Sequence, residues 1–347
     1  MRLNPWLTVI VEMTSSMGTM TPSPAKACIG VDVGGTNLRF ALVDSGGSVL
    51  LRERLETAID QGRDAFLKRL VNGIAGIKRG ATALGITVQG VGIGVPGLID
   101  ASGLVLSSVN LSPIDGVNIA QVVARTAGLP AIAVNDANAA AFGEQQYGAG
   151  RAFASLLLLT LGTGVGSGLV LNGELWRGID GVAAEFGHAT MEPDGLPCPC
   201  GNRGCLEQYA SAGALVRGAL GALQQGSASL LAGYAPEAVT AAGIAAAARQ
   251  GDALAAALYE NAGRYLGIAA ATIVNLLNLE AIVLAGGVAG SFELLVEPMQ
   301  REIVRRAFSV PAARVRIVRG ELGDDAGILG AAALFRVKGE ATVLPGV

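Results

Sequence analysis

Aromatic and charged side chains are both scarce in this sequence. Phe, Trp and Tyr make up 4% of its 347 residues, and Asp, Glu, Lys and Arg together make up 15%, with a formal net charge of −3. Proteins that bind nucleic acids present basic surfaces and, for single strands, aromatic side chains on which the bases stack. Because the sequence has neither a basic run nor many aromatics, we expect no nucleic-acid partner.

Long apolar runs are also missing. A helix that spans a bilayer needs about 20 apolar residues, whereas the longest candidates here, residues 156–161 and 282–285, have the length of strands. Residues 7–11 are too short for the apolar core of a signal peptide. The Thr-, Ser- and Pro-rich stretch after them indicates a disordered tail over 1–26. We therefore expect a cytoplasmic protein with no membrane partner.

What the chain does have is apolar material and glycine. Hydrophobic residues make up 51% of the sequence, and 50 residues are glycine. A chain of this length most often folds as two domains, and strand-length apolar runs alternate with segments of helical periodicity, as in α/β proteins. The expected strands cover residues 27–31, 39–44, 49–54, 89–95, 131–134, 155–161, 169–175, 281–285 and 315–318. The expected helices cover residues 64–78, 119–127, 137–147, 212–223, 241–250, 253–277, 291–308 and 326–335.

One local plan occurs twice. A strand, a turn of Gly and Thr and a second strand follow one another around residues 32–36 and again around residues 162–166. A duplicated hairpin of this kind predicts two related lobes that face each other across a cleft. The alternative is a coincidence between two glycine-rich hairpins.

Both turns are suited to phosphate. In the first, Asp32 ends a strand and precedes Gly34, Gly35 and Thr36. Backbone N–H groups in such a turn can cradle phosphate oxygens, and a carboxylate there can hold a hydrated Mg²⁺. The alternative is an ordinary glycine turn.

The second turn, predicted as a loop over 162–168, begins with Gly162, Thr163 and Gly164. It leads into a strand and has Ser167 where a dinucleotide-binding fingerprint needs its third glycine, so a phosphate clamp is favoured over a Rossmann site. A tight turn without a ligand is the alternative. A third site, Gly286-Gly287, follows a strand and is a candidate support for adenosine, although simple packing between strand and helix explains it equally well.

Asn135 and Asp136 stand where a strand ends and a helix begins. Asn and Asp are preferred helix N-caps, so capping alone explains either residue. Phosphoryl transfer to a hydroxyl also needs a carboxylate that accepts the alcohol proton. Together with the glycine turns, Asp136 is predicted to be that general base.

The metal-ligating residues are few and close together. The only histidine, His188, lies just before three of the four cysteines, Cys198, Cys200 and Cys205. Three thiolates and one imidazole are a ligand set typical of structural Zn²⁺, and they leave no open position for a catalytic water. The sequence therefore predicts a structural zinc knuckle.

Two acidic residues flank this knuckle. Glu185 and Glu207 on a rigid loop can accept hydrogen bonds from neighbouring hydroxyls of a sugar. The alternatives are a carboxylate that orients His188 and, for Glu207, a negative charge at a helix N-terminus.

Together these residues resemble the ROK family (repressors, open reading frames, sugar kinases), from residue 28 to about residue 335. The family's phosphate motifs are matched at 32–36 and 162–168, its E-x-G-H signature at 185–188, and its C-x-C-G-x-x-G-C-x-E signature at 198–207. The resemblance implies an actin-like (ribonuclease H-like) two-lobe ATPase fold with a cleft between the lobes, ATP with Mg²⁺, and Asp136 as the catalytic base. Around the sugar it implies Gly97, Asn110, Asn135, Asp136, Glu185, His188 and Glu207.

On this basis we expect a small N-terminal α/β lobe over 27–136, joined by a C-terminal helix over 325–337. A larger lobe over 137–324 is expected to carry the zinc knuckle at 188–205. The expected partners are a small-molecule sugar and ATP, and the expected assembly is a homodimer.

The expected activity is ATP-dependent phosphorylation of a hexose at its C6 hydroxyl. Glucose is the first choice, because fixed acceptors suit a row of equatorial hydroxyls; fructose, N-acetylmannosamine, N-acetylglucosamine and allose are alternatives. A non-catalytic sugar-sensing regulator is a further alternative. A DNA-binding repressor is disfavoured because the residues before Asp32 lack helical periodicity.

Overall fold

A computed structural model describes residues 25–109 and 111–342. Asn110 and nearly all of the predicted tail lie outside the described residues. The strands are β1 (Lys26–Val33), β2 (Asn37–Asp44), β3 (Val49–Glu56), β4 (Thr87–Val95), β5 (Leu98–Ile99), β6 (Val105–Ser107), β7 (Ala131–Asn135), β8 (Leu156–Leu161), β9 (Val165–Leu171), β10 (Glu174–Trp176), β11 (Ala281–Ala285) and β12 (Arg316–Arg319). The α-helices are α1 (Arg63–Ala83), α2 (Ile119–Ala127), α3 (Asp136–Tyr147), α4 (Glu207–Ala210), α5 (Ala212–Gln224), α6 (Ala241–Arg249), α7 (Ala253–Leu277), α8 (Phe292–Arg306), α9 (Ser309–Arg314) and α10 (Ala326–Thr342).

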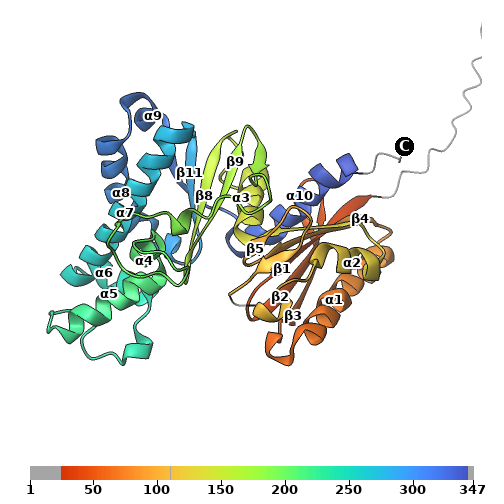
Figure 1. Cartoon of the computed structure of the whole chain (residues 1–347), viewed down its shortest axis with the longest axis horizontal. Coiled ribbons are helices and arrows are strands. Elements are labelled where there is room, and N and C mark those ends of the chain that lie inside the picture. Colours follow the sequence, from red (N-terminus) through yellow and green to blue (C-terminus); the bar gives the residue numbers. More distant parts are fainter. Residues whose placement is uncertain (1–24, 110, 343–347) are drawn as a thin grey trace, which may run out of the picture.

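Ten of the twelve described strands form two five-stranded sheets with the same plan, which Figure 1 shows side by side, and β5 and β6 pair separately. One has the order β3-β2-β1-β4-β7 and the other the order β10-β9-β8-β11-β12. In each sheet the first three strands are antiparallel and the next two join in parallel. The α/β prediction and the predicted internal repeat are therefore confirmed.

The first and second glycine turns occupy matching places, between β1 and β2 and between β8 and β9. The predicted loop over 162–168 was too long, because β9 begins at Val165. Its later glycines serve packing: a Cβ on Gly168 would lie 2.5 Å from the Cβ of Ala141 in α3. The short hairpin β5–β6 and the helices α4 and α9 are additional to the predicted elements.

Helices α3 and α10 lie between the two sheets (Figure 1). Glycine brings the two helices into backbone contact, since a Cβ on Gly330 would lie only 1.7 Å from the carbonyl oxygen of Ala139. On its other side α10 packs on β4, where a Cβ on Gly92 would meet the carbonyl oxygen of Ala331 at 1.8 Å. Small residues therefore set the distance between the sheets.

A buried carboxylate ties the two places where the chain passes between the sheets, after α3 and before α10. Glu144 is fully buried. Its side chain accepts backbone N–H bonds from Ala149 at 2.9 Å, Glu321 at 3.1 Å and Leu322 at 2.9 Å. Three donors compensate the loss of hydration that burial of a carboxylate entails.

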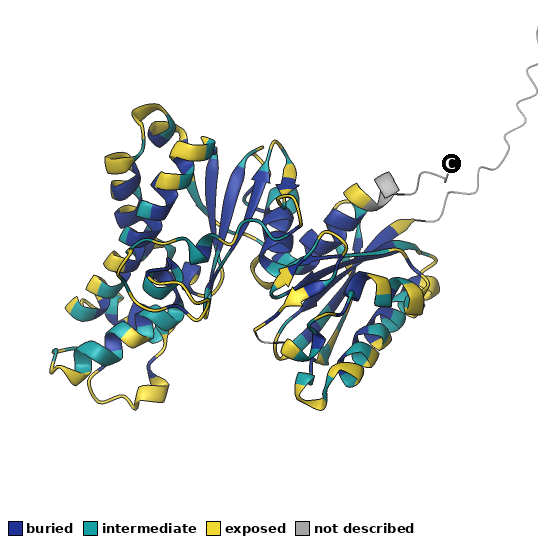
Figure 2. Cartoon of the chain, viewed as in Figure 1, coloured by how far each residue is buried: buried dark blue, intermediate teal, exposed yellow. Residues whose placement is uncertain are grey.

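The strands are largely buried, whereas the outer helices show exposed faces (Figure 2). Each sheet has its own apolar core: Phe66, Leu70 and Ile74 of α1 fill the first, and Leu266, Leu295 and Met299 belong to the second. Within the described residues, no helix is both long enough and apolar enough to cross a bilayer.

Candidate active site

A cavity of about 640 Å³ collects most of the predicted sugar-binding residues. Asn135 ends β7 and Gly97 lies just after β4, both strands of the first sheet, and Gly164 comes from the glycine turn of the second. Glu185, His188, Cys200 and Glu207 also belong to its wall. The remaining wall residues are Pro96, Leu98, Ser107, Ser108, Val109, Val165, Gly166 and Pro199.

Asn135 caps the helix that begins at Asp136. Its Oδ1 accepts the backbone N–H of Asn138 at 3.0 Å, and its Nδ2 donates to the carbonyl oxygen of Gly97 at 3.1 Å. Asp136 is thereby relieved of the capping role, although its Oδ1 accepts the N–H of Ala137 at 2.9 Å. The sequence leaves two roles open for Asp136, helix cap and general base. Because Asn135 is the cap, the role that remains for Asp136 is that of the base.

Asp136 has an environment suited to a base. Burial, reinforced by the negative charge of Asp32, raises the pKa of Asp136 to about 6. The hydrogen bond from Ala137 and the side chain of Asn135 act in the opposite direction. A carboxyl group with a pKa nearer to neutrality takes up a proton more readily than an ordinary aspartate while remaining ionised at neutral pH.

Asp32 lies near the end of β1 and Asp136 directly follows β7, and these two strands flank β4. Asp32 is level with Gly94 of β4, and Gly94 is level with Val134 at the end of β7. A Cβ on Gly94 would lie 3.6 Å from Cα of Asp136, so β4 passes directly beside the start of α3. Burial raises the pKa of Asp32, and the neighbouring Arg39 opposes this rise.

The first glycine turn is held by a backbone hydrogen bond and by the side chain of Thr57. The N–H of Gly34 donates to the carbonyl oxygen of Asn37 at 2.9 Å, and the hydroxyl of Thr57 donates to the carbonyl oxygen of Gly34 at 2.6 Å. Gly35 and Thr36 are exposed, and a Cβ on Gly35 would meet nothing within 4 Å. The turn therefore presents open backbone.

The second glycine turn is fastened to the segment after the cysteines. Glu207 accepts the backbone N–H of Val165 at 3.0 Å, and a Cβ on Gly164 would lie 2.2 Å from the same carboxylate oxygen. The N–H of Ala212, at the start of α5, donates to the carbonyl oxygen of Gly162 at 2.9 Å. Thr163, at the tip of the turn, is exposed.

The third glycine site lies beside the second turn. Gly286 has a φ of 86°, in the left-handed region that favours glycine, and a Cβ there would lie 2.7 Å from the carbonyl oxygen of Leu161. Gly287 is exposed, and a Cβ on it would meet nothing within 4 Å. A flat ligand can approach the backbone at this point.

The predicted metal ligands come together. The ligand atoms of His188, Cys198, Cys200 and Cys205 all lie within 4.8 Å of one another. Nδ1 of His188 lies 3.6 Å from Sγ of Cys198, and the Sγ atoms of Cys200 and Cys205 are 3.7 Å apart. This separation is far longer than a disulfide bond of about 2.05 Å. It matches the edge of a tetrahedron of sulfur atoms about 2.3 Å from a central ion.

Aromatic side chains fasten this loop to α7. The rings of Tyr209 and Tyr265 stack with their centroids 4.3 Å apart. The hydroxyl of Tyr265 donates to Glu192 at 3.0 Å, and that of Tyr209 accepts the N–H of Leu196 at 3.0 Å. The loop is therefore rigidly placed beside the cavity. Partial burial raises the pKa of Glu185 in the same wall, and the nearby His188 opposes this rise.

Two features of the site were not predicted from the sequence. Ser107 and Ser108 lie in the cavity wall, and the buried Oγ of Ser108 has no hydrogen-bond partner among the described residues. Arg39 forms an ion pair with Asp32. The two residues are directly opposite each other in the β1–β2 hairpin, so the register of that hairpin is the signal that could have revealed the pair. The predicted site residues that are not part of the wall of this cavity are Asp32, Gly34, Gly35, Thr36, Asp136, Gly162, Thr163, Gly286 and Gly287. Asp136 directly follows Asn135, which is part of the wall.

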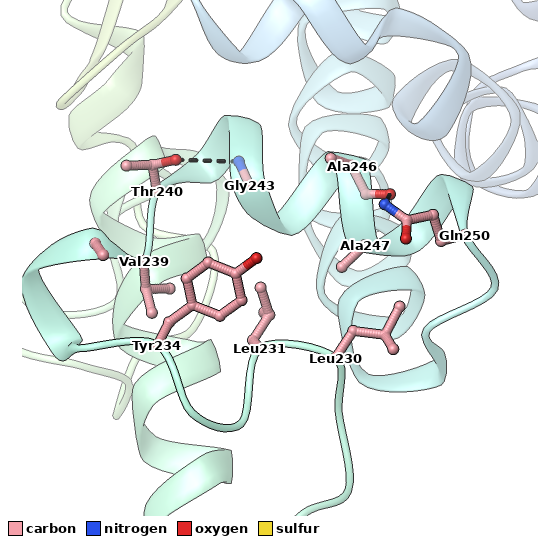
Figure 3. Close-up of a pocket in the computed structure, with 10 residues that line it drawn as sticks. Leu230, Leu231, Tyr234, Val239, Thr240, Gly243, Ala246, Ala247 and Gln250 are labelled. Atoms are coloured by element: carbon pink, nitrogen blue, oxygen red, sulfur yellow. Dashed lines mark hydrogen bonds between the residues drawn. The ribbon is translucent and has the colours of Figure 1, made fainter.

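A smaller cavity of about 140 Å³ lies beside α6 (Figure 3). Leu230, Leu231, Tyr234 and Val239 give it a mainly apolar wall. The hydroxyl of Thr240 is occupied by the N–H of Gly243 at 3.0 Å. Because this wall holds no acidic or metal-ligating side chain, it offers none of the chemistry gathered in the larger cavity.

A family model described as the ROK family matches residues 28–338. The chain belongs to the ROK family. It is 36% identical over 317 residues to the glucokinase of Thermotoga maritima, covering 90% of this chain and 98% of that protein.

Solved structures of family members are similar over most of the chain. A ROK family glucokinase from Streptomyces griseus, in complex with glucose and AMPPNP, is 35% identical with a TM-score of 0.74 and covers 90% of this chain and 99% of that one. A ROK family transcriptional regulator, described as a homolog of the E. coli MLC protein, is 28% identical with a TM-score of 0.82 and covers 90% of this chain and 78% of that one.

Proposed function

We propose that this protein transfers the γ-phosphoryl group of ATP to the C6 hydroxyl of a hexose, with glucose as the preferred substrate. The observation that carries the proposal is the cavity shared by Asn135, Glu185, His188 and Glu207 with the glycine turn at Gly164. Groups that bind hydroxyls and a turn that binds phosphate are thus combined in one space. The glucokinases among its relatives support the same activity.

On the acceptor side, Asp136 takes the proton of the attacking hydroxyl as the oxygen–phosphorus bond forms. Glu185 and the second oxygen of Glu207 accept hydrogen bonds from the other sugar hydroxyls. Asn135 borders the sugar, and its side chain also caps α3, donates to the carbonyl oxygen of Gly97 and interacts with Asp136. Gly97 lies at the sugar's edge, and Asn110 is proposed as a further contact outside the described residues.

On the donor side, backbone N–H groups of Gly35 and Thr36 and of Thr163 and Gly164 cradle the phosphates. Gly34 and Gly162 shape these turns, since their own N–H groups donate to the carbonyl oxygens of Asn37 and Gly164, and Gly286 and Gly287 support the adenosine. Asp32 is the residue that would hold a hydrated Mg²⁺. When bound, this ion neutralises the charge that develops on the transferred group. The chain's own contribution is orientation, which brings the hydroxyl into line with the phosphorus atom.

We further propose that His188, Cys198, Cys200 and Cys205 bind a structural Zn²⁺. The separations of the ligand atoms suit a tetrahedral site. Nδ2 of Asn202 lies 3.4 Å from Sγ of Cys205, and Nε2 of Gln208 lies 3.6 Å from Sγ of Cys198, as donors to thiolate sulfur. With Nδ1 on the metal side, the other nitrogen of His188 is left for a sugar hydroxyl.

The proposal includes a lobe over 27–136, joined by 325–337, and a lobe over 137–324 with the zinc knuckle at 188–205. The two matching sheets support this division. It also includes a homodimer, which the exposed apolar side chains of Leu276, Val304 and Phe308 support. Light scattering tests the dimer directly.

The test of the activity is ADP release measured across a panel of hexoses with ATP and Mg²⁺, with the phosphorylated position identified by NMR. We expect kcat/KM to be highest for glucose and phosphate to appear on C6. A tenfold preference for fructose or for an N-acetyl hexose would refute glucose as the substrate while leaving the kinase intact.

A non-catalytic sugar-responsive regulator is the second candidate, and the similarity to the ROK transcriptional regulator favours it. The two functions differ in one measurement. A regulator binds the sugar without releasing ADP, whereas a kinase releases one ADP for each sugar phosphate formed.

A further inference from the structure

Arg39 is the polar neighbour that defines the position of Asp32. The β1–β2 hairpin sets the two residues directly opposite each other, so their side chains lie on the same face of the sheet. Nε and Nη2 of Arg39 both donate to Oδ2 of Asp32, at 2.9 and 2.5 Å. Among the described residues every side-chain hydrogen bond to Asp32 goes to Oδ2.

The other oxygen of Asp32 is left with space. Oδ1 faces α10 at Gly327, where a Cβ would lie 3.3 Å away. A larger residue at this position would press against Oδ1, whereas glycine leaves room around it. Asp32 is therefore a carboxylate with one oxygen held and one oxygen available.

Arg39 is itself anchored on its outer side. Its Nη1 lies 3.5 Å from Oδ2 of Asp324, which belongs to the 3-10 turn Gly323–Asp325 before α10. The side chain of Asp324 is 97% exposed, whereas that of Asp32 is 10% exposed. The guanidinium thus links a buried carboxylate at the end of β1 with an exposed one next to α10.

We propose that Arg39 is a positioning residue for phosphoryl transfer, which holds Oδ2 of Asp32 and so leaves Oδ1 available to the hydrated magnesium ion that would accompany the nucleotide phosphates. This inference rests on the proposed kinase function. Mg²⁺ requires nearly ideal octahedral geometry and keeps most of its water, so a carboxylate that serves its hydration shell must have a defined direction. The planar fork of an arginine defines the direction of a carboxylate, which a lysine does not.

The chain offers a matched control. Arg52 lies on β3, next to β2, and binds Asp325 through two hydrogen bonds of 2.6 and 2.7 Å. This pair reaches the same turn before α10 as Arg39 does, but it does not include Asp32. Substitution of Arg52 therefore shows how loosening of that turn alone affects nucleotide binding, because the groups that hold Asp32 are unchanged.

The test compares Arg39→Gln, Arg39→Lys and Arg52→Gln with the wild type by calorimetric binding of ADP, with and without Mg²⁺. We expect Arg39→Gln to bind metal-free ADP as the wild type does and to lose about tenfold or more of the gain in affinity that Mg²⁺ brings, the scale of a hydrogen bond to a charged group. Arg39→Lys should recover only part of this gain. Arg52→Gln should keep all of it.

If Mg²⁺ increased the ADP affinity of Arg39→Gln as much as that of the wild type, the inference would be overturned. It would also be overturned if Arg52→Gln lost as much of this increase as Arg39→Gln, because the effect would then come from general loosening of the turn before α10. If Arg39→Gln does not fold, a full wild-type gain in Arg39→Lys overturns it instead. ADP release from the wild type with hexoses, measured alongside, tests the proposed function separately. A wild type that binds MgADP but phosphorylates no sugar refutes the kinase, not the role of Arg39.

Discussion

The carboxylate of Glu207 accepts a hydrogen bond from the backbone N–H of Val165 across 42 residues of sequence, at 3.0 Å. This contact joins the helix after the cysteines to the second glycine turn. Glu207 is a proposed sugar-binding residue, and one oxygen of its carboxylate also positions a proposed phosphate-binding turn. The acceptor and donor halves of the site are coupled through a single side chain.

Substitution of Glu207 should separate these two roles. In Glu207→Gln the amide oxygen can still accept from Val165, while an NH₂ group replaces the oxygen offered to the sugar. We expect the KM for glucose to rise about 10- to 100-fold, the equivalent of one hydrogen bond to a charged group, with the KM for ATP unchanged. Glu207→Ala should raise both KM values. Steady-state kinetics with each substrate varied in turn measures these KM values. The same changes in both KM values for Glu207→Gln and Glu207→Ala would contradict the assignment.

Asp136→Asn keeps the shape of the side chain but cannot accept the proton of the sugar hydroxyl. We expect kcat to fall by about 10²–10⁴-fold, the contribution typical of a general base, with glucose affinity nearly unchanged. The cap of α3 should survive because Asn135 provides it. Turnover near that of the wild type would show that Asp136 is not the base.

The pH dependence should carry the signature of Asp136. Burial and the charge of Asp32 raise the pKa of Asp136 to about 6, and the base must be ionised to work. We therefore expect kcat/KM for glucose to fall as pH decreases through about 6, since kcat/KM reports ionisations of the free enzyme. An acid limb that persists in the residual activity of Asp136→Asn would belong to another group.

The same raised pKa predicts the effect of Asp136 on stability. The carboxyl group titrates near 3.9 in an unfolded chain and at about 6 in the fold. The folded state thus binds the proton more tightly, so this group favours folding below about pH 4 and loses that contribution as pH rises through 6. Asp136→Asn should therefore have a higher Tm than the wild type near neutral pH, with the difference shrinking in acid. Thermal unfolding at several pH values checks both signs.

Removal of the proposed zinc should damage the sugar site more than the nucleotide site. We expect one equivalent of Zn²⁺ in the purified protein, and loss of both metal and sugar phosphorylation in Cys200→Ser, with ADP binding retained. Cys28→Ala is the control, because Cys28 lies in β1 and outside the cluster of ligands. Metal analysis and calorimetry test this, and a metal-free preparation with full activity would contradict it.

Much of the fold was predictable because its signals are local. Helix α7 and strand β11 have the bounds expected from apolar periodicity. The four metal-ligating residues also come together as predicted, since they lie within one short segment of the chain. The repeated plan of the sheets follows from two hairpins that the sequence repeats.

Local signals failed where packing governs the backbone. The glycines of residues 162–168 suggested one long loop, yet Gly166 and Gly168 lie in β9 because α3 packs against that strand. A glycine required by a neighbouring helix and a glycine required by a turn look the same in sequence. The short hairpin β5–β6 and helix α4 were missed because elements of two to four residues carry too little periodicity.

The sequence by itself determined which residues are chemically able to serve the site: the acids, the glycine turns and the ligands of the metal cluster. Only the tertiary structure decided how they are used. In the fold, Asn135 is the N-cap of α3, Glu207 accepts a hydrogen bond from the backbone of Val165, and Arg39 donates to Asp32. The raised pKa of Asp136 arises in the same way, from burial and from the charge of Asp32 on another strand. Such relations depend on distances between segments far apart in the chain, which exist only once the two sheets have formed.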